Sequence, residues 1–166
     1  VIEVAIVATP PGGRLEILDA LPNLKAVLVE KPLADSIENA TAFLAYCQAR
    51  RIAVAVCLPR RYDSSLRHLA EGGLSAMVGR PMSAFATYGN GLANNGTHLI
   101  DMIRFLLGEV ASVQAVAGAE SFVEGPIDGD INLPFSCVLS SGLSVMISPL
   151  HFSAYREVGL DIWGEA

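Results

Sequence analysis

The first half of the chain alternates between short apolar runs and amphipathic segments. Apolar runs, nearly continuous over residues 1–8 and continuous over 26–29 and 52–58, suit strands that are buried on both faces. Between them, residues 14–21 and 35–51 are predicted to form helices. The second of these begins with a capping-box-like pair, Asp35 and Glu38, and ends at Arg50-Arg51. Strands that alternate with helices predict an α/β unit with a parallel sheet.

The second half of the chain has a different pattern. Helices are predicted over residues 64–71, ending at Gly72-Gly73, and over 97–107, and strands over 82–88 and 110–117. Three further segments alternate between apolar and polar positions and are joined by short turns, which predicts an antiparallel meander. They cover residues 133–139, 143–147 and 158–162. We therefore expect two domains, residues 1–70 with the parallel sheet and residues 71–166 with an α+β fold and an open antiparallel sheet.

The composition excludes several classes of protein. Of 166 residues, 52% are hydrophobic and 17% are charged, against about 25% charged in ordinary domains, which excludes a disordered tail. A net charge of −6 argues against nucleic-acid binding. The uncharged stretch 131–155 is long enough for a membrane span, but polar residues 140–142 interrupt it and strand-like alternation flanks them. The low charge count suggests that part of the surface is covered, either by another subunit or by a missing piece of the chain.

The cysteines indicate the compartment. Cys47, Cys57 and Cys137 are odd in number and far apart, and no Cys-x-x-Cys pair or Cys/His cluster occurs. We therefore expect no metal site, and we expect a reducing, cytoplasmic location. The chain also lacks the basic region and apolar core of a secretory signal peptide.

Ligand chemistry is expected at the carboxyl ends of the predicted parallel strands. These ends carry Thr9-Pro10, Glu30-Lys31-Pro32 and Pro59-Arg60-Arg61. If the strands are neighbours, their ends form a cationic crevice suited to an anionic ligand, such as a dinucleotide phosphate or a sugar acid. The alternative is that the arginines begin a solvated helical turn and Lys31 only ends a strand.

A second group of polar residues surrounds His98. This histidine falls in the first turn of the helix predicted over 97–107, where the positive end of the helix dipole would lower its pKa and favour the neutral, basic form. Asp101 follows one turn later and could orient the ring. The alternative is a structural histidine at a helix start, and His68 and His151 are interpreted as surface or structural residues.

Other motifs are incomplete or absent. The segment Asp128-Gly129-Asp130-Ile131-Asn132 resembles the opening of an EF-hand loop, but the sixth and twelfth positions are Leu133 and Leu139, so calcium is not expected. There is no G-x-G-x-x-G, so the usual phosphate-binding fingerprint of a dinucleotide domain is absent from these residues.

Four segments together resemble the Gfo/Idh/MocA family of NAD(P)-dependent oxidoreductases. In chain order they are AIVATPP, LVEKPLADSIENA, LPRRYD and NNGTHLIDMIRFLLGEV. The resemblance implies a Rossmann domain followed by an α/β domain whose open antiparallel sheet often forms the subunit interface. It also implies that the chain begins in the second half of the Rossmann domain and stops inside the sheet. On that expectation the chain is a fragment that lacks the N-terminal glycine-rich loop and the C-terminal end, and is inactive by itself.

The resemblance implies roles for individual residues. Thr9 and Pro10 match the segment that lines the cofactor, NAD or NADP, near its ribose and nicotinamide. Glu30, Lys31 and Pro32 match the motif beside the nicotinamide, and Lys31 is the lysine between nicotinamide and substrate. Arg61 matches an arginine that contacts cofactor or substrate.

In the second domain, His98 matches the catalytic proton acceptor. Many family members carry Asp four residues before this histidine, whereas this chain carries Asn94, which can orient an imidazole but cannot stabilise an imidazolium as a carboxylate does. On this reading Lys31, Asn94 and His98 line one cleft.

Three functions remain open. The first is hydride transfer to or from a sugar, cyclitol or related hydroxy/keto compound by a homo-oligomer, a dimer or tetramer that associates through the antiparallel sheet. The second is a non-catalytic homologue that serves as a binding or assembly subunit. The third is an enzyme that uses NAD transiently for elimination, without net redox change.

Overall fold

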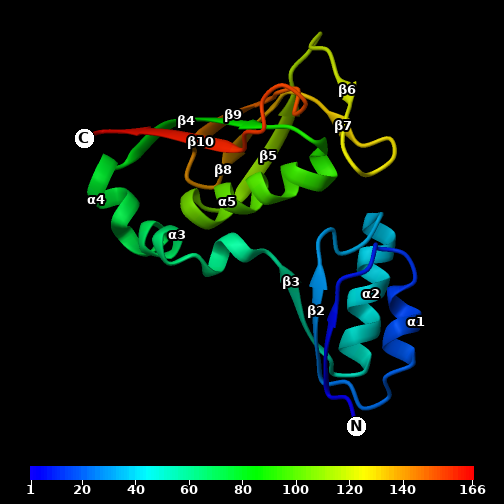
Figure 1. Ribbon diagram of the computed structural model, residues 1–166. Coiled ribbons are helices and arrows are strands. Elements are labelled where there is room, and N and C mark those ends of the chain that lie inside the picture. Colours follow the sequence, from blue (N-terminus) through cyan, green and yellow to red (C-terminus); the bar gives the residue numbers. More distant parts are fainter. The chain divides into compact units, whose positions relative to one another are not determined.

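A computed structural model describes all residues, 1–166, and divides them into two compact units. The first unit is Val1–Cys57 and the second is Leu58–Ala166. The boundary we placed at residue 70 falls inside the second unit, because the helical segments that follow Leu58 contact α5 of that unit. The two units are described separately below (Figure 1).

The first unit is a three-stranded parallel sheet in the order β1-β2-β3, with two helices on one face (Figure 1). Its elements are β1 (Val4–Val7), α1 (Arg14–Asp19), β2 (Ala26–Glu30), α2 (Ile37–Ala49) and β3 (Ala53–Cys57). Its core joins apolar side chains of the strands to those of the helices, among them Val29, Leu18 and Phe43. Parallel pairing of Val7 with Val29 and of Glu30 with Cys57 brings the carboxyl ends of all three strands to one edge.

Two details of this unit differ from the sequence analysis. Burial on both faces was wrong for β1, where Val4 and Ile6 are 66% and 74% exposed, because helices cover only one face of the sheet. Helix α2 is capped by Ser36 rather than Asp35: the Ser36 hydroxyl accepts a hydrogen bond from the backbone N–H of Asn39.

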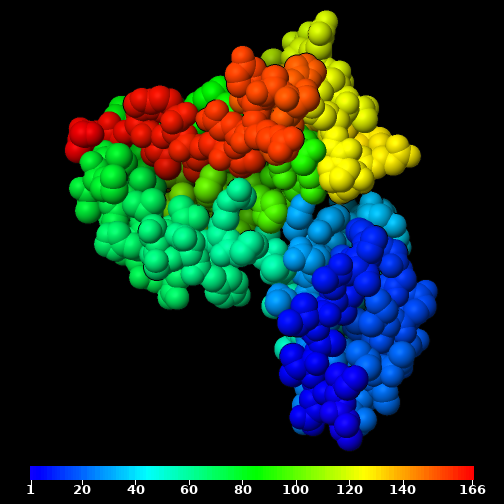
Figure 2. Space-filling view, in the orientation of Figure 1, coloured from blue at the N-terminus to red at the C-terminus, as the bar shows by residue number.

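The second unit is built on a five-stranded sheet in the order β10-β4-β9-β8-β5. The strands are β4 (Pro81–Tyr88), β5 (Val110–Ala115), β8 (Phe135–Leu139), β9 (Ser144–Pro149) and β10 (Gly159–Gly164). Helix α5 (Thr97–Leu107) lies on one face and buries Leu99 and Ile103 against Ala86, Val145 and Ile147 of the sheet. Strand β10, red in Figure 2, forms an edge of the sheet.

The sheet is mixed rather than purely antiparallel. Strands β8 and β9 form the predicted antiparallel hairpin, but β10 pairs with β4 instead of continuing the meander. Strand β4 in turn runs parallel to β9. The meander was therefore wrong for its third strand, because turn lengths do not determine which neighbour a strand pairs with once another edge is available. The fold class, a Rossmann-like parallel sheet followed by an α+β domain, is confirmed.

Short helical elements connect Leu58 to β4. They are η1 (Pro59–Tyr62), α3 (Ser64–His68), η2 (Leu69–Gly73) and α4 (Leu74–Val78). The first helical segment ends here as predicted, because Gly72 adopts a non-helical φ of +118° that kinks the chain. A further helix, α4, which was not predicted, begins at Leu74. Gly72 tolerates the positive φ that other residues avoid.

The remaining elements belong to a loop that precedes β8. Strands β6 (Phe122–Val123) and β7 (Ile131–Asn132) pair antiparallel across the acidic segment between them. None of the helices has both the length and the hydropathy needed to cross a membrane. No three His, Cys, Asp or Glu side chains gather in a way that could hold a metal ion.

Candidate functional site

Two loops leave the parallel sheet of the first unit side by side. Thr9-Pro10 follows β1, and Lys31 and Pro32, which are joined by a cis peptide bond, follow Glu30, the last residue of β2. Because β1 and β2 are parallel and in register through Val7 and Val29, both loops emerge at the same edge of the sheet. The structure thus brings together five of the predicted cofactor-binding residues, Thr9, Pro10, Glu30, Lys31 and Pro32, in the position where sheets of this kind bind ligands.

Arg14, in the first turn of α1, connects these two loops. Its guanidinium donates hydrogen bonds to the carbonyl oxygens of Thr9 (2.6 Å), Pro32 (2.7 Å) and Leu33 (2.9 Å). The side chain is buried, and burial lowers the pKa of Arg14, although the negative charge of Glu30 opposes this. The loops are therefore held together by a buried cation that the sequence analysis had not singled out.

Glu30 also has a neighbour on the third strand. Glu30 and Cys57 are partners in the parallel register. The pKa of the Cys57 thiol is raised, first by burial and then by its hydrogen bond with the Glu30 carboxylate. A thiol with a raised pKa is a poor nucleophile, so Cys57 is interpreted as a packing and hydrogen-bonding residue of this edge.

In the second unit, the residues before His98 form a short π-helical segment, η3 (Gly91–Gly96), that runs directly into α5. The buried Asp130 carboxylate accepts hydrogen bonds from the backbone N–H groups of Ala93 and Asn94, both at 3.0 Å. The Asn132 side chain accepts a third from Gly91 at 2.9 Å. These acceptors satisfy the free N–H groups at the start of the helical run.

This arrangement corrects the argument made for His98. We expected the histidine in the first turn of a helix, but the helical run begins at Gly91, so His98 lies about two turns further in. The dipole effect falls off within the first turn, and its positive end is already occupied by Asp130. The positive end of a helix dipole is therefore not a reason to expect the neutral, basic form of His98.

Gly91 is required by this contact. It adopts φ +93°, and a Cβ at this position would collide with the Asp130 carboxylate. The carboxylate can therefore approach the backbone only because no side chain stands in the way.

The environment of Asn94 suits an amide. Its side-chain NH₂ donates to the carbonyl oxygen of Asn90 at 3.0 Å, and its backbone N–H faces the Asp130 carboxylate. An aspartate in this position would place a second carboxylate beside Asp130 and would have no hydrogen to offer Asn90. The departure from the family's usual Asp is therefore matched by the residues around it.

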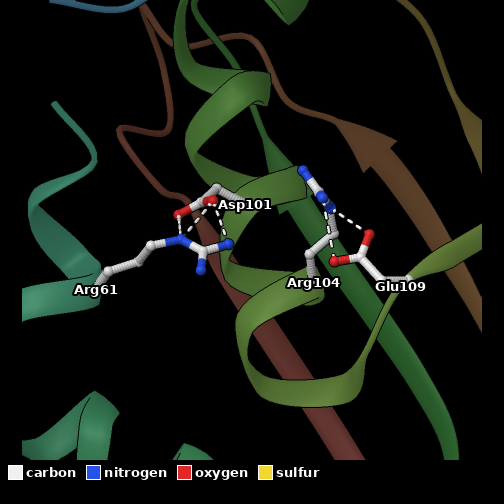
Figure 3. A network of polar contacts seen from close by, with 4 residues as sticks. All are labelled: Arg61, Asp101, Arg104 and Glu109. Carbon is white, nitrogen blue, oxygen red and sulfur yellow. Dashed lines mark hydrogen bonds and ion pairs between the residues drawn. The ribbon is translucent and has the colours of Figure 1, made fainter. Parts of the chain in front are cut away.

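Arg61 and Asp101 form an ion pair between η1 and α5 (Figure 3). The Nε atom of Arg61 lies 2.8 and 3.0 Å from the two carboxylate oxygens of Asp101, and Nη2 lies 2.8 Å from one of them. The guanidinium also lies over the ring of Phe105, 5.2 Å from its centroid. Asp101, which we expected to orient His98, is thus engaged by the arginine that the resemblance assigned to cofactor or substrate.

The structure therefore places the predicted residues in two groups. The first unit holds the residues that follow β1 and β2, and the second unit holds Asn94, His98 and Arg61. Of the other histidines, His151 stacks its ring on Phe122 with centroids 4.0 Å apart, and His68 is exposed in α3. Sequence reasoning missed Arg14, Asp130 and Asn132, and the only signal was the acidic segment 128–132, interpreted as an incomplete calcium loop.

We expect Asp130→Ala to lower the free energy of unfolding by about 1–3 kcal/mol, because it leaves two backbone N–H groups at a helix start without acceptors. Denaturant unfolding measures this change. Asp128→Ala, which removes an exposed carboxylate from the same loop, is the matched control and should change stability by less than about 0.5 kcal/mol. Equal effects of the two variants would contradict the capping role.

Comparisons with known proteins agree with this architecture. No protein-family profile matches the chain. Inositol 2-dehydrogenase 3 from Saccharopolyspora erythraea is 31% identical over an alignment 126 residues long that covers 68% of this chain and 37% of that protein. The chain therefore spans well under half the length of this curated relative.

Solved structures show the same fold. Levoglucosan dehydrogenase in complex with NADH and levoglucosan superposes with a TM-score of 0.78 at 22% identity, covering 99% of this chain and 52% of that one. An oxidoreductase from Agrobacterium radiobacter in complex with NAD⁺, L-tartaric acid and magnesium gives a TM-score of 0.72 at 20% identity, with 98% and 53% covered. The chain thus has the fold of about half of each of these structures.

Proposed function

In its motifs and its fold the chain is a member of the Gfo/Idh/MocA family, and from this premise we propose that the whole protein is an NAD(P)-dependent oxidoreductase. Its reaction is hydride transfer between the cofactor and a sugar, cyclitol or related hydroxy/keto compound. The observation that carries the proposal is the shared edge of the parallel sheet, where the Thr9 and Lys31 loops emerge together. Ligands of doubly wound sheets bind at this edge.

The residues at this edge fit the nicotinamide end of a dinucleotide. Thr9 and Pro10 would line the ribose and nicotinamide, and Glu30, Lys31 and Pro32 would lie beside the ring. The 166 residues contain no G-x-G-x-x-G, so nothing in them is assigned to the pyrophosphate. When bound, the cofactor accepts or supplies the hydride, and the protein supplies position and charge.

Lys31 and His98 carry the proposed acid–base chemistry. The Lys31 ammonium would donate a hydrogen bond to the substrate oxygen and stabilise the negative charge that develops there. His98 would accept the hydroxyl proton during oxidation and return it during reduction. Asn94, through its place one turn before His98, would orient the imidazole without adding a charge.

Two similar proteins support a polyhydroxylated substrate. One is an inositol dehydrogenase and the other a levoglucosan dehydrogenase, so both act on a ring that carries several hydroxyl groups. A secondary alcohol on such a ring presents the C–H and O–H that hydride transfer and proton transfer require.

The experiment is a cofactor-turnover assay of the whole protein. NAD⁺ and NADP⁺ are each offered with inositols, sugars and anhydrosugars, and NAD(P)H formation is followed by absorbance. The expected result is turnover of at least one polyol, with deuterium passing from substrate carbon to cofactor. A protein that binds NAD(H) but neither oxidises a polyol nor reduces a carbonyl contradicts hydride transfer as its function.

Thermal-shift measurements with each cofactor, sedimentation and product analysis of the same protein separate the two alternatives. A stable oligomer without affinity for either cofactor identifies a binding or assembly subunit, and a product formed without net NAD(P)H change identifies elimination.

We also propose that the protein forms a homo-oligomer through the face of the five-stranded sheet that α5 does not cover. Four large apolar side chains on this face are 38–56% exposed, namely Phe85, Val138, Met146 and Trp163. Apolar side chains gathered on one open face are typical of a subunit interface. Phe85→Glu should shift the sedimentation coefficient of the protein to that of a smaller species, and an unchanged value would contradict this interface.

The three cysteines support a reducing compartment, and we propose a cytoplasmic location on this basis. Cys47, Cys57 and Cys137 are all free thiols, and Cys47 and Cys137 are buried. Fluorescent tagging of the whole protein followed by cell fractionation tests the location, and recovery outside the cytoplasm would contradict it.

A further inference from the structure

We propose that Arg14 is a positioning residue for the nicotinamide end of the cofactor site: it fixes the spacing between the Thr9 loop and the Lys31-Pro32-Leu33 loop. This inference rests on the proposed function for its catalytic consequence, but its structural part concerns only the first unit. Arg14 would act on the position of the cofactor-binding loops and would take no part in hydride or proton transfer.

The hydrogen bonds of Arg14 end only on these two loops. Nη2 donates to the carbonyl oxygen of Thr9 after β1, and Nη1 donates to the carbonyl oxygens of Pro32 and Leu33 after β2. Beyond the strand ends the two loops have no parallel ladder between them, since the register of β1 with β2 ends at the pair Val7 and Val29. Beyond the last ladder pair, the hydrogen bonds of the planar guanidinium connect the two loops, and its fixed geometry sets the distance between them.

Core packing alone does not account for a charge at this position. Arg14 is 2% exposed, it forms no ion pair within 4.0 Å, and its Nε has no hydrogen-bond partner. Burial of a charge that lacks an ion pair costs stability, and an apolar side chain would fill the space without that cost. The charge is explained by the three carbonyl oxygens that accept its hydrogen bonds, and these belong to the loops that carry Thr9 and Lys31.

Arg50 offers a matched comparison within the same unit. Its guanidinium also donates to backbone carbonyls, those of Leu18 and Leu21, at 2.9 Å each. Arg50 follows the last turn of α2, and its two partners lie in the last turn of α1 and just after it. All of these residues are at the ends of the helices remote from the carboxyl ends of the strands. Arg50 therefore performs the same kind of tethering without contact to either candidate cofactor loop.

The test compares Arg14→Lys with Arg50→Lys in the whole protein. An ammonium has three donors on one atom and cannot reproduce the spacing of a guanidinium fork. We expect Arg14→Lys to speed amide hydrogen exchange at Gly12 and Gly13 and at residues 31 and 33–35, and to lower kcat for hydride transfer at least tenfold. Arg50→Lys should change kcat less than twofold, even where its loss of thermal stability is the same.

The outcomes separate the two hypotheses. Unchanged exchange in both loops, or an equal loss of kcat in the two variants at equal stability, overturns the role of Arg14. If the wild-type protein turns over no substrate, the proposed function fails, and the exchange measurement still decides whether Arg14 fixes the loops. If Arg14→Lys does not fold, Arg14→Gln, whose neutral NH₂ can donate two hydrogen bonds, takes its place under the same criteria.

Discussion

Replacing His98 by alanine is expected to lower kcat for polyol oxidation by about 10²–10⁴-fold, because a positioned general base contributes an acceleration of this size. The KM for the substrate should change much less, since proton transfer belongs to the transition state and not to ground-state binding. The acidic limb of the pH–rate profile should also flatten, because no side chain remains that must lose a proton before it can act. Steady-state kinetics over a range of pH measures all three effects.

His68→Ala is the control for this variant. His68 is exposed in α3, and its replacement should leave kcat within twofold. Lys31→Ala should lower kcat by a similar factor to His98→Ala, through loss of electrostatic stabilisation of the substrate oxygen. Normal turnover by His98→Ala, with its acidic limb intact, would remove His98 from the mechanism and leave Lys31 to be explained separately.

The parallel sheet was readable from sequence because its signals are local. Apolar runs that end in Pro-containing loops marked β1, β2 and β3 to within one or two residues at their carboxyl ends, and helical spacing marked α1, α2 and α5. The pairing of β10 with β4 was not readable, because alternation assigns a strand its two faces but not its neighbour.

The supporting residues of the candidate site were missed for a different reason. Arg14 looked like the first residue of an amphipathic helix, and only the fold shows that the carbonyls of Thr9 and Pro32 converge on it. Asp130 is separated from its partners by 36 and 37 positions in the chain. Positions of catalytic type can be proposed from motifs, whereas the groups that hold them depend on contacts between distant segments.

Arg61 is expected to be a stability residue of the second unit, and Arg61→Met tests this. Asp101 is 9% exposed in its side chain, so removal of Arg61 leaves a nearly buried carboxylate without its cation. Arg61 is itself 37% exposed, which reduces the effect below that of a fully buried pair. We expect the free energy of unfolding to fall by about 2–3 kcal/mol.

Arg104→Met is the matched control, because Arg104 lies in α5, the helix that also carries Asp101 (Figure 3). The Nε of Arg104 lies 2.8 Å from Glu109, a distance like that of the buried pair, but the two side chains are 45% and 64% exposed. Pairs in solvent contribute at most about 1 kcal/mol, so Arg104→Met should cost less than that. Adding Asp101→Asn to Arg61→Met removes the uncompensated charge and should restore part of the lost stability. Denaturant unfolding of the wild type and the three variants measures these differences, and equal losses for Arg61→Met and Arg104→Met would show that burial does not govern the strength of this pair.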